Sequence, residues 1–422
     1  MILYKFRKLL NKLKSTKSLK MKLLLLFAAL CFCIFSNFKT FIRSSSKEKK
    51  GILIFADGTF ASNALMVVPV ANKLKEIDHK KKIIFLCEYG GEKTNHLRDL
   101  LDSRIELKSI KSFYLINKYS LYKRKEFFYK ILSSLIYTIY ITRLISKINP
   151  KFVLLSNDIM YPSRLIAFVS SMNNTRNISL QHGVISDDYF PLMADNIGVY
   201  SQFEKELLKS KYNINTKRIE IMGNPRWDYL YKLNNLKTKG TDSYIMVISQ
   251  TSYLDTYPKD ERVILFIKHL DSLIKKLENI TFKIRLHPNE TISNYQLYSS
   301  ILEYKNVTIT QSNESLIESI QNSKFVIMIN STTVYEALLL GKNCILCKFG
   351  ENSSIHHYPD QILDNVFLAL NYNKLLNYSV DLINNNQFEN SKLDFISYYG
   401  NSAEQVAKYI LADKSKGGCY EG

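Results

Sequence analysis

The sequence has few of the residues that build disulfide frameworks or zinc sites. Two of its six cysteines, Cys31 and Cys33, lie inside an apolar segment near the N-terminus. Cys344 and Cys347 form a single C-x-x-C inside the strand-like run NCILCKF. Because no second pair completes a zinc site and no spacing suggests disulfides, we expect Cys344 and Cys347 to be buried thiols.

Glycine and proline are also scarce, with 14 and 8 residues in a chain of 422. This scarcity excludes collagen-like and Pro/Gly-rich disordered chains, and 46% hydrophobic residues are typical of a globular protein. After the N-terminal segment about 370 residues remain, which is enough for two domains of ordinary size.

The 38 acidic residues are fewer than the 58 Lys and Arg residues, but the excess of basic residues is confined to two segments. Residues 1–50 contain thirteen Lys/Arg and one acid, residues 108–151 contain ten and one, and the rest of the chain is nearly neutral. This distribution argues against a nucleic-acid-binding protein. Both basic segments are interleaved with apolar or aromatic residues, which indicates contact with anionic membrane lipids.

The N-terminal segment contains an apolar run, Leu23–Phe38, of sixteen residues without a charge. A spanning helix usually needs about 17–25 residues, and Lys22 and Lys39 could extend this one by snorkelling. We interpret the run as an uncleaved membrane anchor helix, either spanning or lying in one leaflet. A cleaved signal peptide is the competing interpretation, but the small-residue cleavage site is missing.

The second basic segment, 108–151, predicts a long helix over roughly 119–147 with many aromatic residues among its lysines. Such a helix can lie at a bilayer surface. The cluster Lys123, Arg124 and Lys125 is the most specific membrane-contact candidate. The alternative is a core helix with a solvated lysine face.

Short apolar runs alternate with helical patterns after residue 50, which predicts α/β architecture with parallel sheets. Strands are expected at 51–56, 82–87, 152–156, 178–181, 196–200, 218–223, 244–249, 282–286, 307–310, 325–329 and 344–349. Helices are expected at 61–75, 163–172, 259–278, 314–321 and 332–340, with two more in 374–413.

A polar stretch, Lys232–Asp242, separates the two series, and Asn224-Pro225-Arg226 precedes it as a turn that could shape a hinge. The expected organisation is two Rossmann-like domains facing a cleft. Its parts are 1–50 (basic terminus, anchor and tether), 51–231 (acceptor domain), 243–372 (nucleotide-donor domain) and 373–422 (C-terminal helices).

Polar residues follow several strands of the second series, where α/β sheets bind ligands. Ser331, Thr332 and Thr333 open a helix, so their hydroxyls and backbone N–H groups could bind a diphosphate. Glu336, one turn later, could bind ribose hydroxyls; alternatively this is a plain N-cap with a capping-box acid.

Two further loops of the second series are donor-binding candidates. Arg285, His287 and Pro288 follow another strand, and His287 could hydrogen-bond or protonate a leaving phosphate. Gln250 and Thr251 follow the first strand of this series.

The first series carries candidates for the acceptor side. His182, between Gln181 and Gly183, follows a strand and could transfer a proton near neutral pH. Other candidates are Asp57 with Gly58, which could equally be an ordinary Asp-Gly turn, and Asp158. A structural loop histidine is the alternative for His182.

In combination, QHG, GNPRWD, RLHP and a Ser/Thr-rich loop followed by YEALLLGK resemble glycosyltransferases of the GT-B fold. The resemblance covers roughly residues 51–365. The nearest look-alikes are bacterial surface-polysaccharide enzymes: polysialyltransferase-like proteins, capsule Kdo transferases and CDP-glycerol glycerophosphotransferases.

The resemblance implies a donor nucleotide in the C-terminal domain and an acceptor on the N-terminal domain. It implies that His287 contacts the leaving phosphate, that Ser331–Thr333 form the phosphate loop, and that His182 is the base. Asp57 matches only half of the paired-acid motif of the polysialyltransferase group, because Ala56 replaces the first acid. No DxD-type metal motif is present, so metal-independent chemistry is expected, with no cofactor beyond the nucleotide-activated substrate.

These observations predict a membrane-associated transferase that moves a sugar or polyol phosphate onto a surface glycan or lipid-linked acceptor. The alternatives are a non-hydrolysing nucleotide-sugar epimerase and a non-catalytic nucleotide-sugar-binding membrane protein. The expected location is the bacterial inner membrane with cytoplasmic catalytic domains. A Golgi type II protein is the alternative, although a glycan on the sequon Asn330-Ser331-Thr332 would block the predicted phosphate loop.

Overall fold

The computed structural model of the protein describes residues 49, 51–56, 63–88, 92–110, 126–159, 161–235, 243–249, 261–286, 298–310, 314–329, 331–350, 358, 360–384 and 396–412. The predicted anchor, Leu23–Phe38, and the cluster Lys123, Arg124 and Lys125 lie outside these residues. Within them, no helix combines the length and apolar character needed to cross a bilayer.

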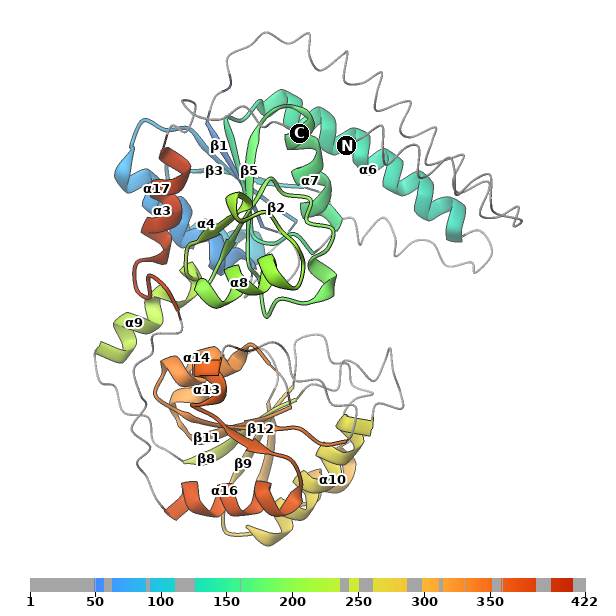
Figure 1. Ribbon diagram of the computed structural model, residues 1–422, viewed down its shortest axis with the longest axis vertical. Coiled ribbons are helices and arrows are strands. Elements are labelled where there is room, and N and C mark those ends of the chain that lie inside the picture. The colour runs from blue at the N-terminus through green and yellow to red at the C-terminus, as the bar shows by residue number, and fades with distance from the viewer. Residues whose placement is uncertain are drawn as a thin grey trace. The chain divides into compact units, whose positions relative to one another are not determined.

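Two parallel sheets organise the chain, which confirms the predicted α/β class (Figure 1). The first sheet has the order β3-β2-β1-β4-β5-β6-β7 and the second has the order β10-β9-β8-β11-β12-β13. The strands are β1 (Ile52–Ala56), β2 (Ile83–Cys87), β3 (Glu106–Ser109), β4 (Phe152–Leu155), β5 (Arg176–Leu180), β6 (Asn196–Val199), β7 (Ile219–Ile221), β8 (Tyr244–Ile248), β9 (Phe282–Arg285), β10 (Val307–Thr310), β11 (Ser323–Met328), β12 (Asn343–Cys347) and β13 (Phe367–Ala369).

Each sheet contains the doubly wound order 3-2-1-4-5-6, in which strand order reverses beside the first strand. In the second sheet the reversal lies between β8 and β11, which pair in parallel. Ligands of open α/β sheets bind outside the carboxyl ends of the strands at such a reversal. The topology therefore marks the ends of β8 and β11 as a ligand position.

Helices connect the strands. They are α3 (Leu65–Ile77), α4 (Glu92–Leu100), α6 (Glu126–Ile148), α7 (Tyr161–Met172), α8 (Gln202–Ser210), α9 (Asp228–Asn235), α10 (Glu261–Lys276), α12 (Ser299–Leu302), α13 (Leu316–Gln321), α14 (Thr333–Leu339), α15 (Asp360–Leu363), α16 (Tyr372–Asn384) and α17 (Ser402–Leu411). Short 3-10 turns are η2 (Asp187–Tyr189), η3 (Thr216–Arg218) and η4 (Pro225–Trp227).

The chain forms two compact units that are interleaved in sequence. The first comprises residues up to Leu180, Phe190–Ile197 and the chain from Ala407 onward, and the second comprises Gln181–Tyr189 and Gly198–Val406. The loop Gln181-His182-Gly183 and the turn η4 therefore belong to the same unit as the second sheet.

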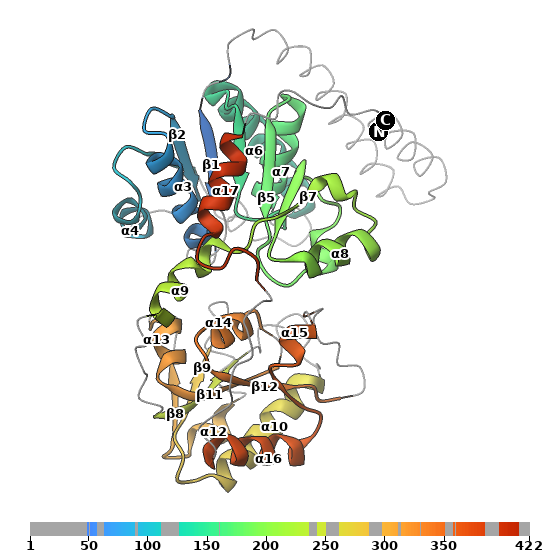
Figure 2. The same ribbon diagram turned by 60° about the vertical axis from the view of Figure 1, so that its left-hand side comes forward.

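In the second unit, alternate residues of each strand enter separate cores on the two faces of the sheet. Met246, Val326 and Met328 pack with α13 and α14, whereas Val247 and Ile327 pack with α10, α12 and α16 (Figure 2). This period of two is the pattern expected for strands covered by helices on both faces.

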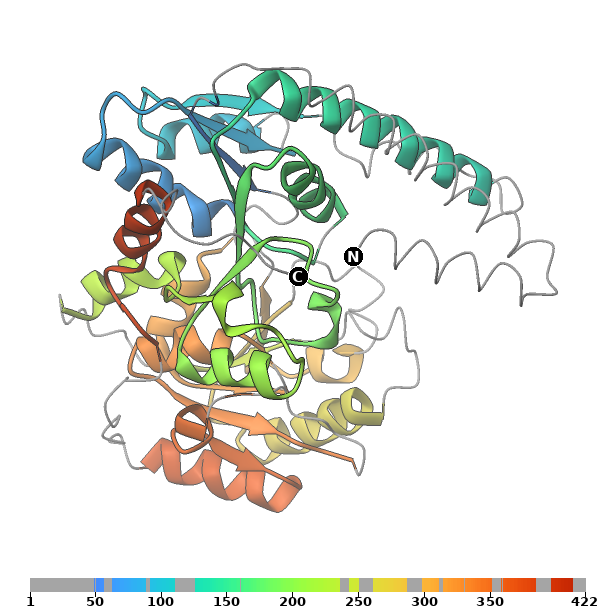
Figure 3. The same ribbon diagram turned by 45° about the horizontal axis from the view of Figure 1, so that its top comes forward.

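The first unit has the same layering. One face of the first sheet is covered by α6 and α7, which pack on Leu53, Phe55, Val153 and Leu155. The opposite face is covered by α3 and the end of α17 (Figure 1), where the ring of Tyr409 meets that of Phe152 edge-on. Helix α6, teal in Figure 3, continues well past the edge of the sheet.

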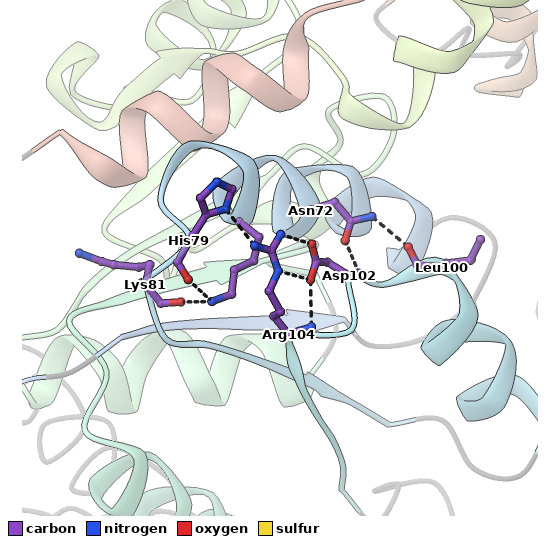
Figure 4. Close-up of polar contacts among 7 residues, drawn as sticks. Asn72, His79, Lys81, Leu100, Asp102 and Arg104 are labelled. Atoms are coloured by element: carbon purple, nitrogen blue, oxygen red, sulfur yellow. Dashed lines mark hydrogen bonds and ion pairs between the residues drawn. The ribbon is translucent and has the colours of Figure 1, made fainter.

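A cluster of polar side chains joins the turns at the amino ends of β2 and β3 (Figure 4). The side-chain amide oxygen of Asn72 accepts from the backbone N–H of Asp102 at 2.8 Å, and Arg104 forms an ion pair with Asp102 and contacts His79. The Lys75 ammonium donates to two backbone carbonyls of the turn after α3. Because ligands bind at the opposite, carboxyl edge, we interpret this cluster as structural.

Strand β3 forms one edge of the first sheet and is charged and partly exposed. Glu106 forms ion pairs with Lys108 at 2.6 Å and with Lys82 at 3.6 Å. A strand with the sequence ELKS has too little apolar character to stand out in the sequence, so it was not predicted.

Most of the predicted strands and helices are present, with boundaries shifted by a few residues. Strands β3 and β13 and helices α4, α8, α9, α12 and α15 were not predicted. Helix α9 includes Lys232, the start of the predicted linker, and residues 236–242 lie outside the described ranges. Cys344 and Cys347 are buried as expected, and they enter the cores on opposite faces of β12.

An isoleucine-to-alanine substitution should destabilise the protein more in the core between the second sheet and α10 than on the exposed surface of α10. Ile327 is fully buried in β11, and Ile327→Ala should lower the free energy of unfolding by about 2–5 kcal/mol through lost burial and a cavity. Ile264 on α10 is 52% exposed, so Ile264→Ala should change it by less than about 0.5 kcal/mol. Urea unfolding of both variants checks this, and similar losses would contradict the layer assignment.

Candidate functional site

The loop after β5 is held by the side chain of Gln181, which is 1% exposed. Its amide nitrogen donates to the carbonyl of Gly183 at 2.7 Å, and its amide oxygen accepts from the backbone N–H of Tyr200 at 3.1 Å. Its own backbone N–H donates to the carbonyl of Gly198 at 2.8 Å. Gln181 thus fixes the backbone on both sides of His182.

His182 lies in a largely buried position within this loop. Its backbone N–H donates to the hydroxyl of Tyr189 at 2.9 Å, and its Nδ1 is buried with no hydrogen-bond partner among the described residues. Burial, followed by the positive charge of Arg226, lowers its pKa to about 4. His182 is therefore neutral at pH 7 and able to accept a proton or a hydrogen bond.

A buried ion pair lies close to His182. The Arg226 guanidinium donates to Oε1 of Glu336, and the indole N–H of Trp227 donates to the same oxygen at 3.1 Å. Glu336 is 3% exposed. Burial disfavours the charged guanidinium, but the Glu336 carboxylate outweighs this effect and the pKa of Arg226 is raised. Arg226 is therefore charged at neutral pH.

Aromatic rings surround the pair. Trp227 stacks on Tyr335 with ring centroids 5.0 Å apart, and Tyr200 contacts Trp227 at 4.8 Å. Tyr229, at the start of α9, is partly exposed, and burial followed by the charge of Glu336 raises its pKa to about 12. Tyr229 therefore remains a neutral phenol near the pair at neutral pH.

The predicted phosphate loop lies at the carboxyl end of β11, where the strand order of the second sheet reverses. The Ser331 hydroxyl donates to Oγ1 of Thr333 at 3.1 Å and accepts from its backbone N–H at 3.2 Å, so it caps the turn that begins α14. The backbone of Ser331 is also bonded to the hydroxyl of Tyr358. The N-cap of α14 is Thr332, which makes no side-chain cap hydrogen bond.

The structure brings the His182 loop and the phosphate loop together. A Cβ atom added to Gly183 would lie 3.5 Å from Cγ2 of Thr332, which is ordinary van der Waals contact. Glu336 does not act as the capping-box acid, because its Oε1 is bound by Arg226 and Trp227. Its Oε2 is buried and has no partner among the described residues, so its contact with a ribose stays a prediction.

Arg285 ends β9. Its Nη2 donates to the carbonyl of Glu314 at 2.7 Å, its Nη1 is buried without a partner in the described ranges, and burial lowers its pKa. The remaining donor-side candidates, His287, Pro288, Gln250 and Thr251, lie outside the described residues. The same holds for Asp57 and Gly58 on the acceptor side.

Asp158, at the end of β4 in the first unit, is completely buried. Its Oδ2 accepts from the backbone N–H groups of Met193 and Ala194 at 2.6 and 2.9 Å. These bonds give Asp158 a structural role in holding the 193–194 turn. No group of three or more His, Cys, Asp or Glu side chains suited to a metal occurs in the described part of the chain.

The sequence missed the residues that complete this site. Asn224-Pro225-Arg226 was interpreted as a turn and GNPRWD as part of the family resemblance, but Arg226, Trp227 and Tyr229 were given no role in the site. The partner of Arg226 is 110 residues away, and no local spacing connects the two. The available signal was the GNPRWD motif itself, with its lone tryptophan beside an arginine after a predicted strand.

Comparisons with known proteins show the fold. No protein-family model matches the sequence, and no curated protein matches it. The MnaA protein of S. aureus, solved with UDP, shares 14% identity and a TM-score of 0.62, over 89% of this chain and 100% of that one. UDP-GlcNAc 2-epimerase from Methanocaldococcus jannaschii, in complex with UDP-GlcNAc and UDP, shares 14% identity and a TM-score of 0.60, over 86% and 99%.

A glycosyltransferase from Rickettsia africae has 16% identity and a TM-score of 0.54, over 87% of this chain and 100% of that chain. The alignments extend over nearly the full length of all three proteins. The two parallel-sheet units therefore have a fold consistent with GT-B.

Removing one member of the buried ion pair should destabilise the protein strongly. Glu336→Ala leaves Arg226 charged and buried without its partner, so we expect a loss of about 3–5 kcal/mol in the free energy of unfolding. Glu76→Ala, which removes the surface pair with Lys73, is the matched control and should cost less than about 1 kcal/mol. Denaturant unfolding measures both, and equal small losses would contradict the role of the pair.

His182 should titrate far below an ordinary histidine. In ¹³C-histidine NMR spectra, the signal lost in His182→Ala should stay neutral from pH 8 to 5 and titrate near pH 4. Burial and the positive charge of Arg226 both lower the pKa of His182, so Arg226→Met, which removes the charge, should raise this pKa. Because the folded pKa lies below the unfolded value of 6.5, His182 should contribute a loss of stability as the pH falls from about 6.5 to 4. A titration midpoint near 6.5 would refute the assigned environment.

Proposed function

We propose that this protein is an enzyme acting on a nucleotide-activated sugar, with the nucleotide bound by the second α/β unit. The observation that carries the proposal is the fold shared over almost the whole chain with proteins that were crystallised with UDP or UDP-GlcNAc. At such low identity the fold alone is shared, so the residues of the site must support the chemistry independently.

The position of the Ser331–Thr333 loop supports nucleotide binding. It follows β11 beside β8, at the reversal of strand order where doubly wound sheets bind ligands. In the proposed complex, the hydroxyl of Thr332 and nearby backbone N–H groups would donate hydrogen bonds to a phosphate. His287, which follows β9, would stabilise the negative charge on the leaving nucleotide.

The state of His182 supports a role in proton transfer. It is neutral at pH 7 and lies next to a fixed positive charge. In transfer, the acceptor oxygen would form a bond to the anomeric carbon while the bond from that carbon to the phosphate oxygen breaks. The acceptor proton would pass to His182, and the nucleotide would leave with the electron pair. Asp57 remains the second candidate for the base.

Two reactions are candidates because different observations favour them. The order of the motifs resembles surface-polysaccharide transferases and favours transfer to a glycan or lipid-linked acceptor. The fold comparison favours epimerisation at C2 at least as strongly, because the M. jannaschii neighbour is named as a UDP-GlcNAc 2-epimerase. Both reactions use the same class of donor.

Location at a bacterial inner membrane, with anionic lipids as a partner, remains part of the proposal. It is supported by the uncharged run Leu23–Phe38 and by the local basic segments. A Golgi membrane location and a non-catalytic nucleotide-sugar-binding role are the alternatives.

The decisive experiment incubates the full chain with a panel of nucleotide sugars, first without and then with a glycan acceptor. An epimerase forms the C2 epimer without acceptor. A transferase releases free nucleotide only with acceptor, and a non-catalytic protein binds the donor without either product. Absence of both binding and turnover across the panel would overturn the proposal.

Two histidines should be required for turnover. His182→Ala and His287→Ala should each lower kcat by at least about 100-fold, the usual contribution of a proton-transferring or charge-stabilising group. His79→Ala, at the amino edge of the first sheet, is the matched control and should be as active as the unaltered protein. Full activity in either site variant, with the protein folded, would remove that residue from the mechanism.

A further inference from the structure

Glu204 is a buried carboxylate that the proposed chemistry does not use. It lies in the first turn of α8 and is 2% exposed. The hydroxyl of Ser201 donates to its Oε2 at 2.5 Å. Burial raises its pKa from the ordinary value of 4.5, and hydrogen bonds from Ser201 and Gln181 oppose that rise.

A capping box explains part of this arrangement. Ser201 is the N-cap of α8 and Glu204 is three residues later, which is the S-x-x-E pattern. A capping box alone needs no burial, and α8 begins at the protein surface with exposed Gln202. Burial of this carboxylate therefore requires a further explanation.

The N-cap that Glu204 stabilises is followed back along the chain by Tyr200, which reaches two other elements. The backbone N–H of Tyr200 donates to the side chain of Gln181, in the loop after β5, at 3.1 Å, and its ring lies 5.9 Å from that of Tyr335, in α14, between centroids. Helix α8, the His182 loop and the helix that carries Glu336 thus meet at the turn that Ser201 and Glu204 hold. All three belong to the second unit.

The link to His182 runs through Tyr200 and Gln181. The Gln181 amide oxygen accepts from the N–H of Tyr200, which precedes the N-cap of α8, and the amide nitrogen donates to the carbonyl of Gly183. The position of Tyr200 therefore sets the orientation of this glutamine, and that orientation sets the backbone on either side of His182.

We propose that Glu204 is a positioning residue that orients the Gln181-His182-Gly183 loop against α14 for the reaction. The proposal rests on the proposed function for its link to turnover, while the orientation of His182 can be measured without any substrate. Loss of Glu204 loosens the turn that presents the Tyr200 N–H to Gln181, and so lets the imidazole leave its reactive position.

The test compares Glu204→Ala and Glu204→Gln in the full chain with Glu206→Gln as the matched control. Glu206 lies on the same helix with a side chain that is 53% exposed. The readouts are the His182 imidazole NMR signal, identified by its loss in His182→Ala, thermal unfolding, and kcat and KM for nucleotide-sugar turnover.

We expect Glu204→Ala to move the His182 signal and to lower kcat by about 10–100-fold, with KM for the donor changed less than about threefold, because misplacement of a reacting group by about 1 Å costs rates of this size. Glu204→Gln, which keeps the shape and part of the hydrogen bonding, should recover much of the activity. Glu206→Gln should match the unaltered protein.

An unchanged His182 signal in folded Glu204→Ala, or in Glu204→Gln if the alanine variant does not fold, overturns the proposal. Changes in thermal unfolding without any change in the His182 signal or in kcat overturn it as well, since they show a structural role alone. If the unaltered protein turns over no nucleotide sugar, the proposed function fails, and the His182 signal still decides the role of Glu204.

Discussion

The buried carboxylate of Glu336 constrains the polar interior of the second unit. A charge with 3% exposure is tolerated only when donors replace the water it has lost. Arg226 and Trp227 supply these donors from a 3-10 turn, and Trp227 reaches Glu336 while its ring stacks on Tyr335. One electrostatic requirement thereby fixes the turn after β7 against helix α14, and the aromatic packing follows from it.

The same requirement sets the electrostatics of the His182 loop. Arg226 must stay charged to satisfy Glu336, and a fixed positive charge near a buried imidazole keeps that imidazole neutral. Gln181 and Tyr189 hold the loop backbone, so the imidazole is presented from a position that hydrogen bonds fix. Groups held in this way need little rearrangement when a reaction begins, which is the basis of electrostatic preorganisation.

The two sheets could be predicted because each central strand is a run of apolar residues between helical patterns, as in GILIFA and FVIMI. Edge strands such as ELKS lack that contrast because one side faces water. For the site, the sequence located His182 and Ser331–Thr333 from their places after strands. It could not reveal the pair between Arg226 and Glu336, because that pair depends on the folded distance between residues 110 positions apart, whereas strand ends are local features.

Strand β3 exposes the edge of the first sheet, but its Glu106 and Lys108 side chains are paired with one another and Glu106 also with Lys82. A second copy could add a strand there only by stripping water from these charges, a cost that apolar edges do not impose. The charged edge therefore protects each molecule against fibre-like growth through edge-to-edge pairing of strands.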